Sequence, residues 1–593
     1  MSQRGEGRWS SPWRIAAIVI GAWLVVFALP LGVRPLFTPD ETRYGLIGWE
    51  MLSTGEWFDL RMDGFRYYEK PPLGYWLIAL SYKVFGVNAW ALRLPSAVCA
   101  LATAGLVATV VWQWKRQASL AGVAALASMF MILPAIVAGL VVLDGVFTTF
   151  VTATIVCFWM AARRDGASGG ASPRRTSLWL FAAGVACAGA FLTKGFLALA
   201  LPAMVAAPWL VWQRRWRDLF TMPVIPLLAA LIAIAAPMWL LHRHEPRFWH
   251  EFFWTEHVRR FTQADVNQHA QPWWLLIVLL PLAALPWSVV TREAVQGLRQ
   301  CRPDRDTVRF LLCWVAIPLL FFSVASGKLV TYILPIFPAI AALLAVGLWE
   351  WYATAAGREA LGKPKLGGVV AVLAGALVLG LALVLGLGLG VNLLSRLGLD
   401  SNLDTMNATF LWPHSPWLHL GGAMLALLAW AIMEFLSQRQ AKLPTRLLLS
   451  ALAPAPMLAM IPLLMSGMHL PPGKAPEAAL ASHMDRLRNA HQVITNDVMA
   501  HAAALLGRRI DVDIVGGVGE FDNELGDAGE QARLVKWADL PGYVAAKRRE
   551  GDVLLIVSAG SPGADQLAAQ APGMITLEDH PDWLVAWWAG QPD

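Results

Sequence analysis

The chain has 593 residues, of which 57% are hydrophobic and only 15% are charged, with a net charge of +6. Soluble globular proteins carry about 25% charged residues, so this composition argues against a soluble protein and indicates a polytopic membrane protein. Its lysines and arginines are scattered between apolar runs, which argues against nucleic acid as a partner. Basic loops that face the cytoplasm explain the positive charge instead.

Apolar runs long enough to cross a membrane, roughly 20 residues each, recur along the chain. By this measure the sequence predicts about thirteen transmembrane helices, at residues 13–33, 88–112, 118–137, 142–162, 177–192, 194–213, 219–241, 272–291, 308–325, 330–350, 367–394, 416–436 and 446–467. Residues 1–467 are therefore expected to form one transmembrane domain.

The loops between these runs indicate an orientation. If the amino terminus is cytoplasmic, the basic clusters at residues 115–116, 163–175, 214–217, 292–309, 358–365 and 439–446 all fall on the cytoplasmic side, as the positive-inside rule requires. The loop at about residues 38–87, the loop at 242–271 and the carboxy-terminal tail then lie on the opposite, outer face.

Residues 468–593 have a different pattern, in which short apolar runs alternate with helix-like stretches, and this predicts a small α/β domain outside the membrane. The expected strands are at 493–495, 510–516, 553–558 and 574–577, and the expected helices are at 476–490 and 498–506. Asp511 and Asp513 form a DxD pattern that can bind a metal in nucleotide-sugar enzymes. Alternation along a strand explains the pair at least as well.

The loop from Thr38 to Tyr75 is dense in charged residues, aromatic residues and prolines, unlike an ordinary connection between spans. We interpret it as the active-site loop of a membrane enzyme.

Asp40 and Glu41 follow the first span directly and are candidate catalytic carboxylates. They could instead mark only a helix start, where the dipole favours acidic side chains by roughly 0.3–1 kcal/mol. The nearby Arg43 and the later Glu69-Lys70-Pro-Pro favour the catalytic interpretation.

Further ionisable residues lie at the predicted outer ends of spans. Asp144 sits in an otherwise apolar run, where a carboxylate is a functional candidate, although it could also be a helix cap. Three lysines place cations on the outer face, which normally has few: Lys70, Lys194 and Lys328. The phenol of Tyr332 lies in the same segment as Lys328. Snorkelling explains any one of these lysines. Together they predict a phosphate site.

Several sequence blocks are similar to a known family. PDETRYGLIGWEML, GFRYYEKPPLGYW, LRLPSA, LDGVFTTF, FLTKGF, EHVRRF and SGKLVTYILP resemble the aminoarabinose transferase (ArnT) family of Gram-negative bacteria. That family belongs to the protein O-mannosyltransferase-like group with the GT-C fold. The similarity covers the membrane portion through about residue 350, and beyond that it rests on the layout, which includes an outer domain.

The resemblance implies an α-helical polytopic GT-C glycosyltransferase in the bacterial inner membrane. Such an enzyme moves 4-amino-4-deoxy-L-arabinose from undecaprenyl phosphate to lipid A phosphates, the modification associated with polymyxin resistance. Its partners are then the lipid-linked donor, the lipid A acceptor and membrane lipids, and a monomer is expected. No nucleotide-binding domain is recognisable, which agrees with a donor that arrives as a lipid-linked phosphate.

The resemblance also assigns residues. Asp40 and Asp144 match the family's two outer-face acidic positions, Lys70 and Tyr332 match residues expected at the carrier phosphate, and Lys194 matches a functionally important lysine. The remaining candidates for binding the donor phosphate or substrate are Arg43, Tyr67, Lys328, His257 and Arg260. Glu69 matches a position that can take part in binding a divalent metal (Zn or Mg), for which His257 or His250 is the candidate partner.

Two other functions are compatible with the residues. One is a related GT-C transferase that moves another sugar, such as a hexose or galacturonic acid, from a polyprenyl carrier. The other is a flippase for a lipid-linked sugar, against which stands the concentration of charge in outer loops rather than near the bilayer midplane, where carriers bind substrate.

Overall fold

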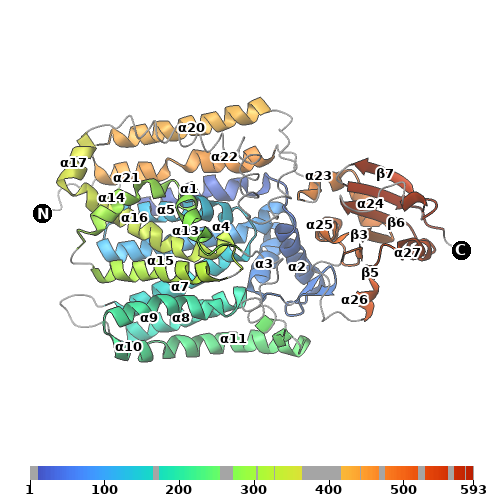
Figure 1. The fold of residues 1–593 in the computed structure, drawn as a ribbon, viewed down its shortest axis with the longest axis horizontal. Helices are drawn as coiled ribbons and strands as arrows, with labels where there is room; N and C mark the ends of the chain where they lie inside the picture. The colour runs from blue at the N-terminus through green and yellow to red at the C-terminus, as the bar shows by residue number, and fades with distance from the viewer. Residues whose placement is uncertain are drawn as a thin grey trace. The chain divides into compact units, whose positions relative to one another are not determined.

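The structure, a computed structural model, describes residues 11–67, 69–163, 172–246, 248–250, 252–253, 271–301, 305–325, 327–362, 416–440, 442–466, 474–517, 528–558, 567–569, 571–580 and 583–591 (Figure 1). The chain divides into two compact units. The first, which we call the bundle unit, comprises residues 1–31, 93–239 and 253–467. The second, the loop unit, comprises residues 32–92, 240–252 and 468–593, so it joins the predicted active-site loop to the carboxy-terminal region.

The bundle unit is helical, as lipid requires, because a helix satisfies its backbone hydrogen bonds internally. Eight helices of the described residues are long and apolar enough to cross a membrane, or up to ten if each of two bent pairs counts as one span. The helices with spanning length and their continuations are α1 (Pro12–Trp23, continued by η1, Leu24–Ala28, and η2, Leu29–Gly32), α4 (Ala89–Lys115), α7 (Leu143–Ala162), α8 (Pro173–Lys194), α10 and α11 (Trp216–Thr221 and Val224–His244), α15 (Arg305–Val324), η5 and α16 (Val330–Ile336 and Phe337–Tyr352), and α21 and α22 (Leu443–Leu452 and Ala455–Ser466).

The other predicted spans differ in form. The bent pairs are α5 with α6 (Ala118–Phe130 and Ile132–Ala138) and α13 with η4 and α14 (Leu275–Ala283, Trp287–Val290 and Thr291–Leu298). Two further predicted spans correspond to α9 (Leu197–Trp212) and α20 (Pro416–Gln438), and a short α17 (Ala355–Gly362) follows α16. The predicted span at 367–394 lies outside the described residues, so the total of thirteen stays a prediction.

Close helix packing in the bundle unit depends on glycine at one crossing in particular. A Cβ added to Gly297 of α14 would collide with the backbone oxygen of Gly347 in α16, and one added to Gly347 would collide with the backbone of Ala294. Small residues let helix backbones approach in a membrane, where lipid supplies no hydrophobic driving force between helices.

The predicted active-site loop is folded rather than irregular. It contains helix α2 (Asp40–Thr54), a hairpin of β1 (Arg61–Met62) and β2 (Phe65–Arg66), and helix α3 (Leu73–Phe85). Asp63 and Gly64 connect the strands with φ angles of 54° and 76°. Two positive φ angles are typical of a type I′ turn, which an Asp-Gly pair favours.

The carboxy-terminal part of the loop unit contains a six-stranded sheet with the order β5-β4-β3-β6-β8-β7. Its strands are β3 (Gln492–Thr495), β4 (Asp513–Val515), β5 (Leu534–Val535), β6 (Val553–Ser558), β7 (Ile575–His580) and β8 (Trp583–Trp588). The first four strands of that order are parallel, and β8 pairs antiparallel with β6 and β7. The helices are α23 (Pro476–Ala481), α24 (Met484–Asn489), α25 (Asp497–Gly507), α26 (Ala528–Ala532) and α27 (Leu540–Lys547).

The sequence patterns anticipated four of these strands and missed two. The missed strand β8 is a continuous apolar run, WLVAWW, whose residues are nearly all buried because both faces of the sheet are covered there. Strand β5 has only two residues, too few for an alternating pattern to be recognised. The hairpin β1–β2 was likewise not anticipated.

Helix α25 packs against helix α2 inside the loop unit (Figure 1). A Cβ on Gly45 of α2 would lie 3.0 Å from Leu505 of α25 and 3.0 Å from the hydroxyl of Tyr82. The active-site loop and the carboxy-terminal sheet therefore share a packed interior.

Glu50 of α2 fastens the hairpin to this interior. Its Oε1 accepts a hydrogen bond of 2.6 Å from the Gly64 N–H, whereas Oε2 is buried with no hydrogen bond among the described residues. Burial raises the pKa of Glu50 to about 7, an effect that the charges of Arg533 and Arg61 only partly oppose. Asp63, which precedes Gly64 in the turn of the hairpin, is a second buried carboxyl group.

This environment makes the stability of the loop unit depend on pH. Since the pKa of folded Glu50 lies above its ordinary value, its contribution to stability is complete below about pH 4.5 and is lost as the pH rises through about 7. At 1.4 kcal/mol per pKa unit, the loss amounts to about 3 kcal/mol.

We expect Glu50→Gln to flatten the pH dependence of the thermal unfolding midpoint of the full-length protein between pH 5 and 8. The exposed Glu56→Gln should keep the wild-type dependence, and an unchanged dependence in Glu50→Gln would contradict this interpretation.

Candidate active site

Five of the predicted site residues meet in the loop unit, and we call them the loop cluster: Asp40, Arg43, Tyr67, Glu69 and Lys70. Arg43 bridges the group, with Nη2 2.7 Å from Oδ1 of Asp40 and Nη1 3.8 Å from Oε2 of Glu69. Tyr67 donates a hydrogen bond of 2.6 Å to the same Glu69 oxygen. Lys70 Nζ lies 3.4 Å from Oε1 of Glu69. These ion pairs connect α2, which precedes the hairpin, with Glu69 and Lys70, which follow it.

Local structure explains how these side chains are presented. Asp40 and Arg43 are three positions apart on α2, so they are neighbours on one helix face. Lys70 precedes Pro71 and Pro72, whose fixed φ angles stiffen the backbone that leads into α3. Asp40 is the most exposed member of the loop cluster, with 47% of its side chain accessible, compared with 28% for Glu69 and 17% for Lys70.

Aromatic side chains close the inner side of the loop cluster. Tyr44 lies 3.2 Å from Arg43 Nη2, and Tyr75 packs against the rings of both Tyr44 and Tyr67. Burial raises the pKa of Tyr67 well above its ordinary value, and the Glu69 carboxylate adds to that effect. Tyr67 is therefore a neutral hydrogen-bond donor at any physiological pH.

Glu41 faces away from the loop cluster. It is buried and accepts two hydrogen bonds from the Arg34 guanidinium, at 2.6 and 2.8 Å, and a third from the Phe37 N–H at 2.9 Å. Glu41 would have to give up these partners to react with a substrate. The geometry favours a role in holding the start of α2, and with it Asp40, in place.

Three predicted site residues meet in the bundle unit, and we call them the span cluster: Asp144, Lys194 and Tyr332. Asp144 lies in the first turn of α7 and Lys194 ends α8, and their side chains form an ion pair of 2.6 Å. Lys194 Nζ also lies 4.9 Å from the ring centroid of Tyr332 in η5, which is a cation–π contact. Asp144 is thus both in a first turn, as the helix-cap alternative requires, and paired with a lysine from a different helix.

The remaining candidates are distributed as follows. Lys328 is buried and donates a hydrogen bond of 2.7 Å to the Gln271 carbonyl, within the bundle unit. His250 is exposed, and His257 and Arg260 lie outside the described residues. Because Asp40 and Lys70 belong to one unit and Asp144 and Tyr332 to the other, their convergence in a single pocket stays a prediction.

A metal site does not appear in the part of the chain that the structure describes, where no group of three His, Cys, Asp or Glu side chains could hold an ion. The proposed pair of Glu69 with His257 stays a prediction. In the DxD pattern, Asp511 pairs with Arg509, whereas Asp513 accepts a hydrogen bond from Tyr543. Asp511 is exposed and precedes β4, whereas Asp513 is buried at the first position of that strand, so alternation within a strand does not explain the pair.

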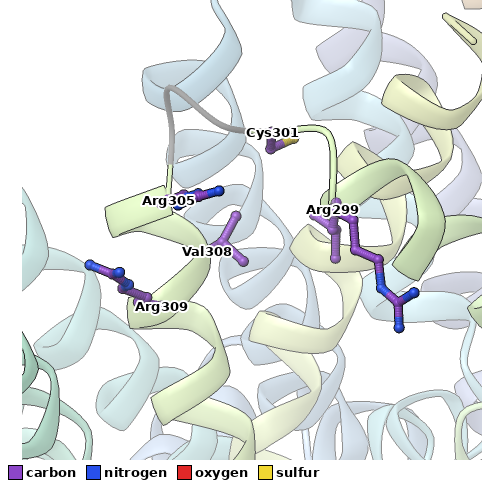
Figure 2. A pocket seen from close by; sticks show the side chains of 6 residues that line it. Arg299, Cys301, Arg305, Val308 and Arg309 are labelled. Atoms are coloured by element: carbon purple, nitrogen blue, oxygen red, sulfur yellow. The ribbon is translucent and has the colours of Figure 1, made fainter.

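The bundle unit has a hollow of 240 Å³ between α14 and α15, and none of the candidate site residues lines it (Figure 2). Arginines 299, 305 and 309 line it with Cys301. The side chains of Arg299 and Arg309 point away from each other, so they do not form a convergent anion site.

Several residues that shape the loop cluster were not predicted from the sequence. Arg34 could have been found as the only arginine between the first span and Asp40, beside a carboxylate that needs a partner. Tyr44 and Tyr75 gave no signal, because aromatic residues at a membrane boundary are normally interface residues.

The buried pair of Arg34 and Glu41 gives a stability prediction. Removing one member of a buried ion pair leaves an uncompensated charge and costs about 3–5 kcal/mol. We expect Glu41→Gln to lower the thermal unfolding midpoint of the purified protein clearly. Asp306→Asn, which removes the partner of Arg309 in an exposed pair, should cost less than about 1 kcal/mol. Equal effects of the two substitutions would contradict the structural role of Glu41.

Two family models match the chain. Residues 13–252 match the model described as dolichyl-phosphate-mannose-protein mannosyltransferase, and residues 472–579 match the C-terminal domain of arabinosyl transferase ArnT. The undecaprenyl phosphate-alpha-4-amino-4-deoxy-L-arabinose arabinosyl transferase of Aeromonas salmonicida is 33% identical over 91% of this chain and 93% of its own length. The protein of the same name from Pseudomonas aeruginosa (strain UCBPP-PA14) is 34% identical over 95% of both chains.

Two solved structures have a similar fold. They are ArnT from Cupriavidus metallidurans in the apo state, with a TM-score of 0.73, and the same protein bound to undecaprenyl phosphate, with a TM-score of 0.75. Both are 21% identical to this chain and cover 98% of it and of their own length. The predicted fold class, a helical GT-C-type membrane protein with a small carboxy-terminal α/β region, is confirmed.

Proposed function

Because the chain belongs to the family of undecaprenyl phosphate-alpha-4-amino-4-deoxy-L-arabinose arabinosyl transferases, we propose that it transfers 4-amino-4-deoxy-L-arabinose from undecaprenyl phosphate to a phosphate of lipid A. One observation carries the proposal: the side chains of the two clusters suit the substrate that the names of these relatives describe. Each cluster contains a carboxylate, a lysine and a tyrosine, which suit an aminosugar linked to phosphate.

The reaction does not need a strong general base. A phosphate monoester has a second pKa near 6, so the acceptor is already largely ionised near neutral pH. Its oxygen attacks the anomeric carbon of the sugar, the bond from that carbon to the carrier phosphate oxygen breaks, and undecaprenyl phosphate leaves with the electron pair. The protein must therefore stabilise negative charge on the leaving phosphate and orient the sugar.

We assign these tasks to the two clusters. Lys70 and Tyr332 stabilise the leaving phosphate, and Lys194, Arg43 and Tyr67 hold neighbouring groups in position. Asp40 and Asp144 engage the ammonium or hydroxyls of the sugar. The 47% exposure of the Asp40 side chain supports direct access to substrate, although Arg43 already occupies one of its oxygens. Lys328, His257 and Arg260 remain candidates for the lipid phosphates.

Substitutions in both clusters test this assignment. We expect Asp40→Asn, Asp144→Asn and Lys70→Ala each to lower aminoarabinose on lipid A by about a hundredfold or more, because each removes a preorganised charge. Mass spectrometry of lipid A from complemented deletion cells gives the readout. Lys83→Ala and Glu56→Gln change exposed charges in the same segment and should leave the modification intact. Full modification in all three cluster variants would refute the assignment, and a different mass increment in wild-type cells would indicate another sugar.

We further propose that the protein is a monomer in the bacterial inner membrane, with a cytoplasmic amino terminus and with residues 468–593 in the periplasm. The basic loops support this orientation. The five native cysteines are all free, and none is exposed.

Cysteine labelling tests the orientation. Ala568 and Gln300 are exposed, the first in the carboxy-terminal region and the second in a basic loop. We expect a membrane-impermeant maleimide to label Ala568→Cys in intact spheroplasts, and to label Gln300→Cys only after the membrane is permeabilised. The reverse pattern would contradict the proposed orientation.

A further inference from the structure

The turn of the hairpin β1–β2 is held by the carboxy-terminal sheet through Asp63. This side chain is fully buried. Its Oδ2 accepts a hydrogen bond of 2.9 Å from Arg533 Nη2, and its Oδ1 accepts one of 3.1 Å from the Val512 N–H. Arg533 Nη1 also donates to the backbone oxygen of Asp63 at 2.7 Å. One arginine therefore binds both the side chain and the backbone of the turn.

Arg533 is itself held by its own domain. Its Nη2 donates to the Val512 carbonyl at 2.5 Å, and its Nε lies 3.4 Å from Oδ1 of Asp513. Tyr543 donates a hydrogen bond of 2.6 Å to the other oxygen of Asp513, which fixes that carboxylate. The guanidinium lies 4.4 Å from the ring centroid of Phe65 in β2, in a cation–π contact.

The backbone of the turn is fitted to the same surface. Gly64 has a φ of 76°, and a Cβ there would lie 2.8 Å from the Ile510 carbonyl and 3.0 Å from Arg533 Nη1. A residue with a side chain could not occupy this position without displacing the turn. Both residues of the Asp-Gly turn are therefore specified by contacts with the sheet region.

The contacts that hold the turn also constrain the loop cluster, because three of its residues follow the hairpin closely. Tyr67 continues the hairpin through a hydrogen bond of 2.8 Å from its N–H to the Leu60 carbonyl, and Glu69 and Lys70 follow at once. The other side of the loop is held as well, because the Thr38 N–H donates to the Lys474 carbonyl at 2.9 Å just before Asp40. The carboxy-terminal region thus fastens both approaches to the loop cluster.

We propose that Asp63 and Arg533 form a latch through which the carboxy-terminal domain positions Glu69 and Lys70 for sugar transfer. The latch residues are positioning residues, since they touch neither phosphate nor sugar. The inference rests on the proposed function only for its effect on the reaction rate. Its structural part, that Arg533 orders the hairpin, stands on the contacts alone.

The latch predicts a defined kinetic change. A displacement of about 1 Å can cost a reaction a factor of about 100 when charged groups must meet a developing charge. We expect Arg533→Met to lower kcat at least about tenfold while the KM for lipid A stays within about twofold. Arg533→Lys keeps the charge but loses the two-pronged donor, so it should recover only part of the rate. Asp63→Asn combined with Arg533→Met should be no worse than Arg533→Met alone.

The experiment uses full-length protein in nanodiscs and measures steady-state transfer together with hydrogen–deuterium exchange. Faster exchange confined to residues 59–67, with strand β6 still protected, is the expected result for Arg533→Met. Arg548→Met is the matched control. Arg548 donates to the Ala589 and Pro572 carbonyls of the same domain, and neither of these residues belongs to the hairpin, so rate and exchange should stay at wild-type values.

Three results would overturn the latch. The first is a loosened hairpin with an unchanged kcat, and the second is a lowered kcat with unchanged exchange in residues 59–67. The third is a loss of protection in β6 equal to that of the hairpin, which would reduce Arg533 to a general stabiliser of the domain. If Arg533→Met does not fold, Arg533→Lys and Asp63→Asn provide the same comparison. A wild-type protein without transferase activity would refute the proposed function, and the exchange result would still decide whether Arg533 orders the hairpin.

Discussion

The bridge from Arg43 to Asp40 and Glu69 is the interaction on which the loop cluster depends. It spans the hairpin and connects α2 to the segment that carries Lys70. Two carboxylates this close to one cation would repel each other if that cation were removed, and the partly buried setting screens the repulsion poorly. The guanidinium suits the task because its planar set of donors can serve two acceptors at once.

Charges must also be paired in the bundle unit, because an unpaired charge is unfavourable in an apolar environment. Asp144 and Lys194 satisfy this requirement by pairing across α7 and α8. In both units a lysine is already matched with a carboxylate before any substrate enters. A bound phosphate could then share the lysine, while the carboxylate turns to the ammonium or hydroxyl groups of an aminosugar. Paired charges of this kind suit a substrate that carries both signs.

The sequence predicted most of the membrane architecture because long apolar runs have few alternatives in lipid. It also predicted as site residues the five side chains that meet in the loop cluster, since charge, aromatic residues and prolines concentrate at Thr38–Tyr75 far beyond what a connection needs; their catalytic roles stay a prediction. It could not predict that Glu41 would pair inward with Arg34, because adjacent carboxylates look equivalent until the helix is placed. The partnership of Asp63 with Arg533 was equally hidden, because the two residues are 470 positions apart in the chain. Only the Asp-Gly pair carried a local signal, that of a tight turn.

The most direct measurement is transfer by the purified chain itself. The protein would be mixed in detergent with undecaprenyl phosphate-linked 4-amino-4-deoxy-L-arabinose and lipid A, and both lipids would be followed by mass spectrometry. The account predicts that lipid A gains the aminosugar while free undecaprenyl phosphate accumulates in equal amount. Unchanged lipids after prolonged incubation with folded protein would contradict it, and would favour a protein that moves the donor across the membrane without reacting with it.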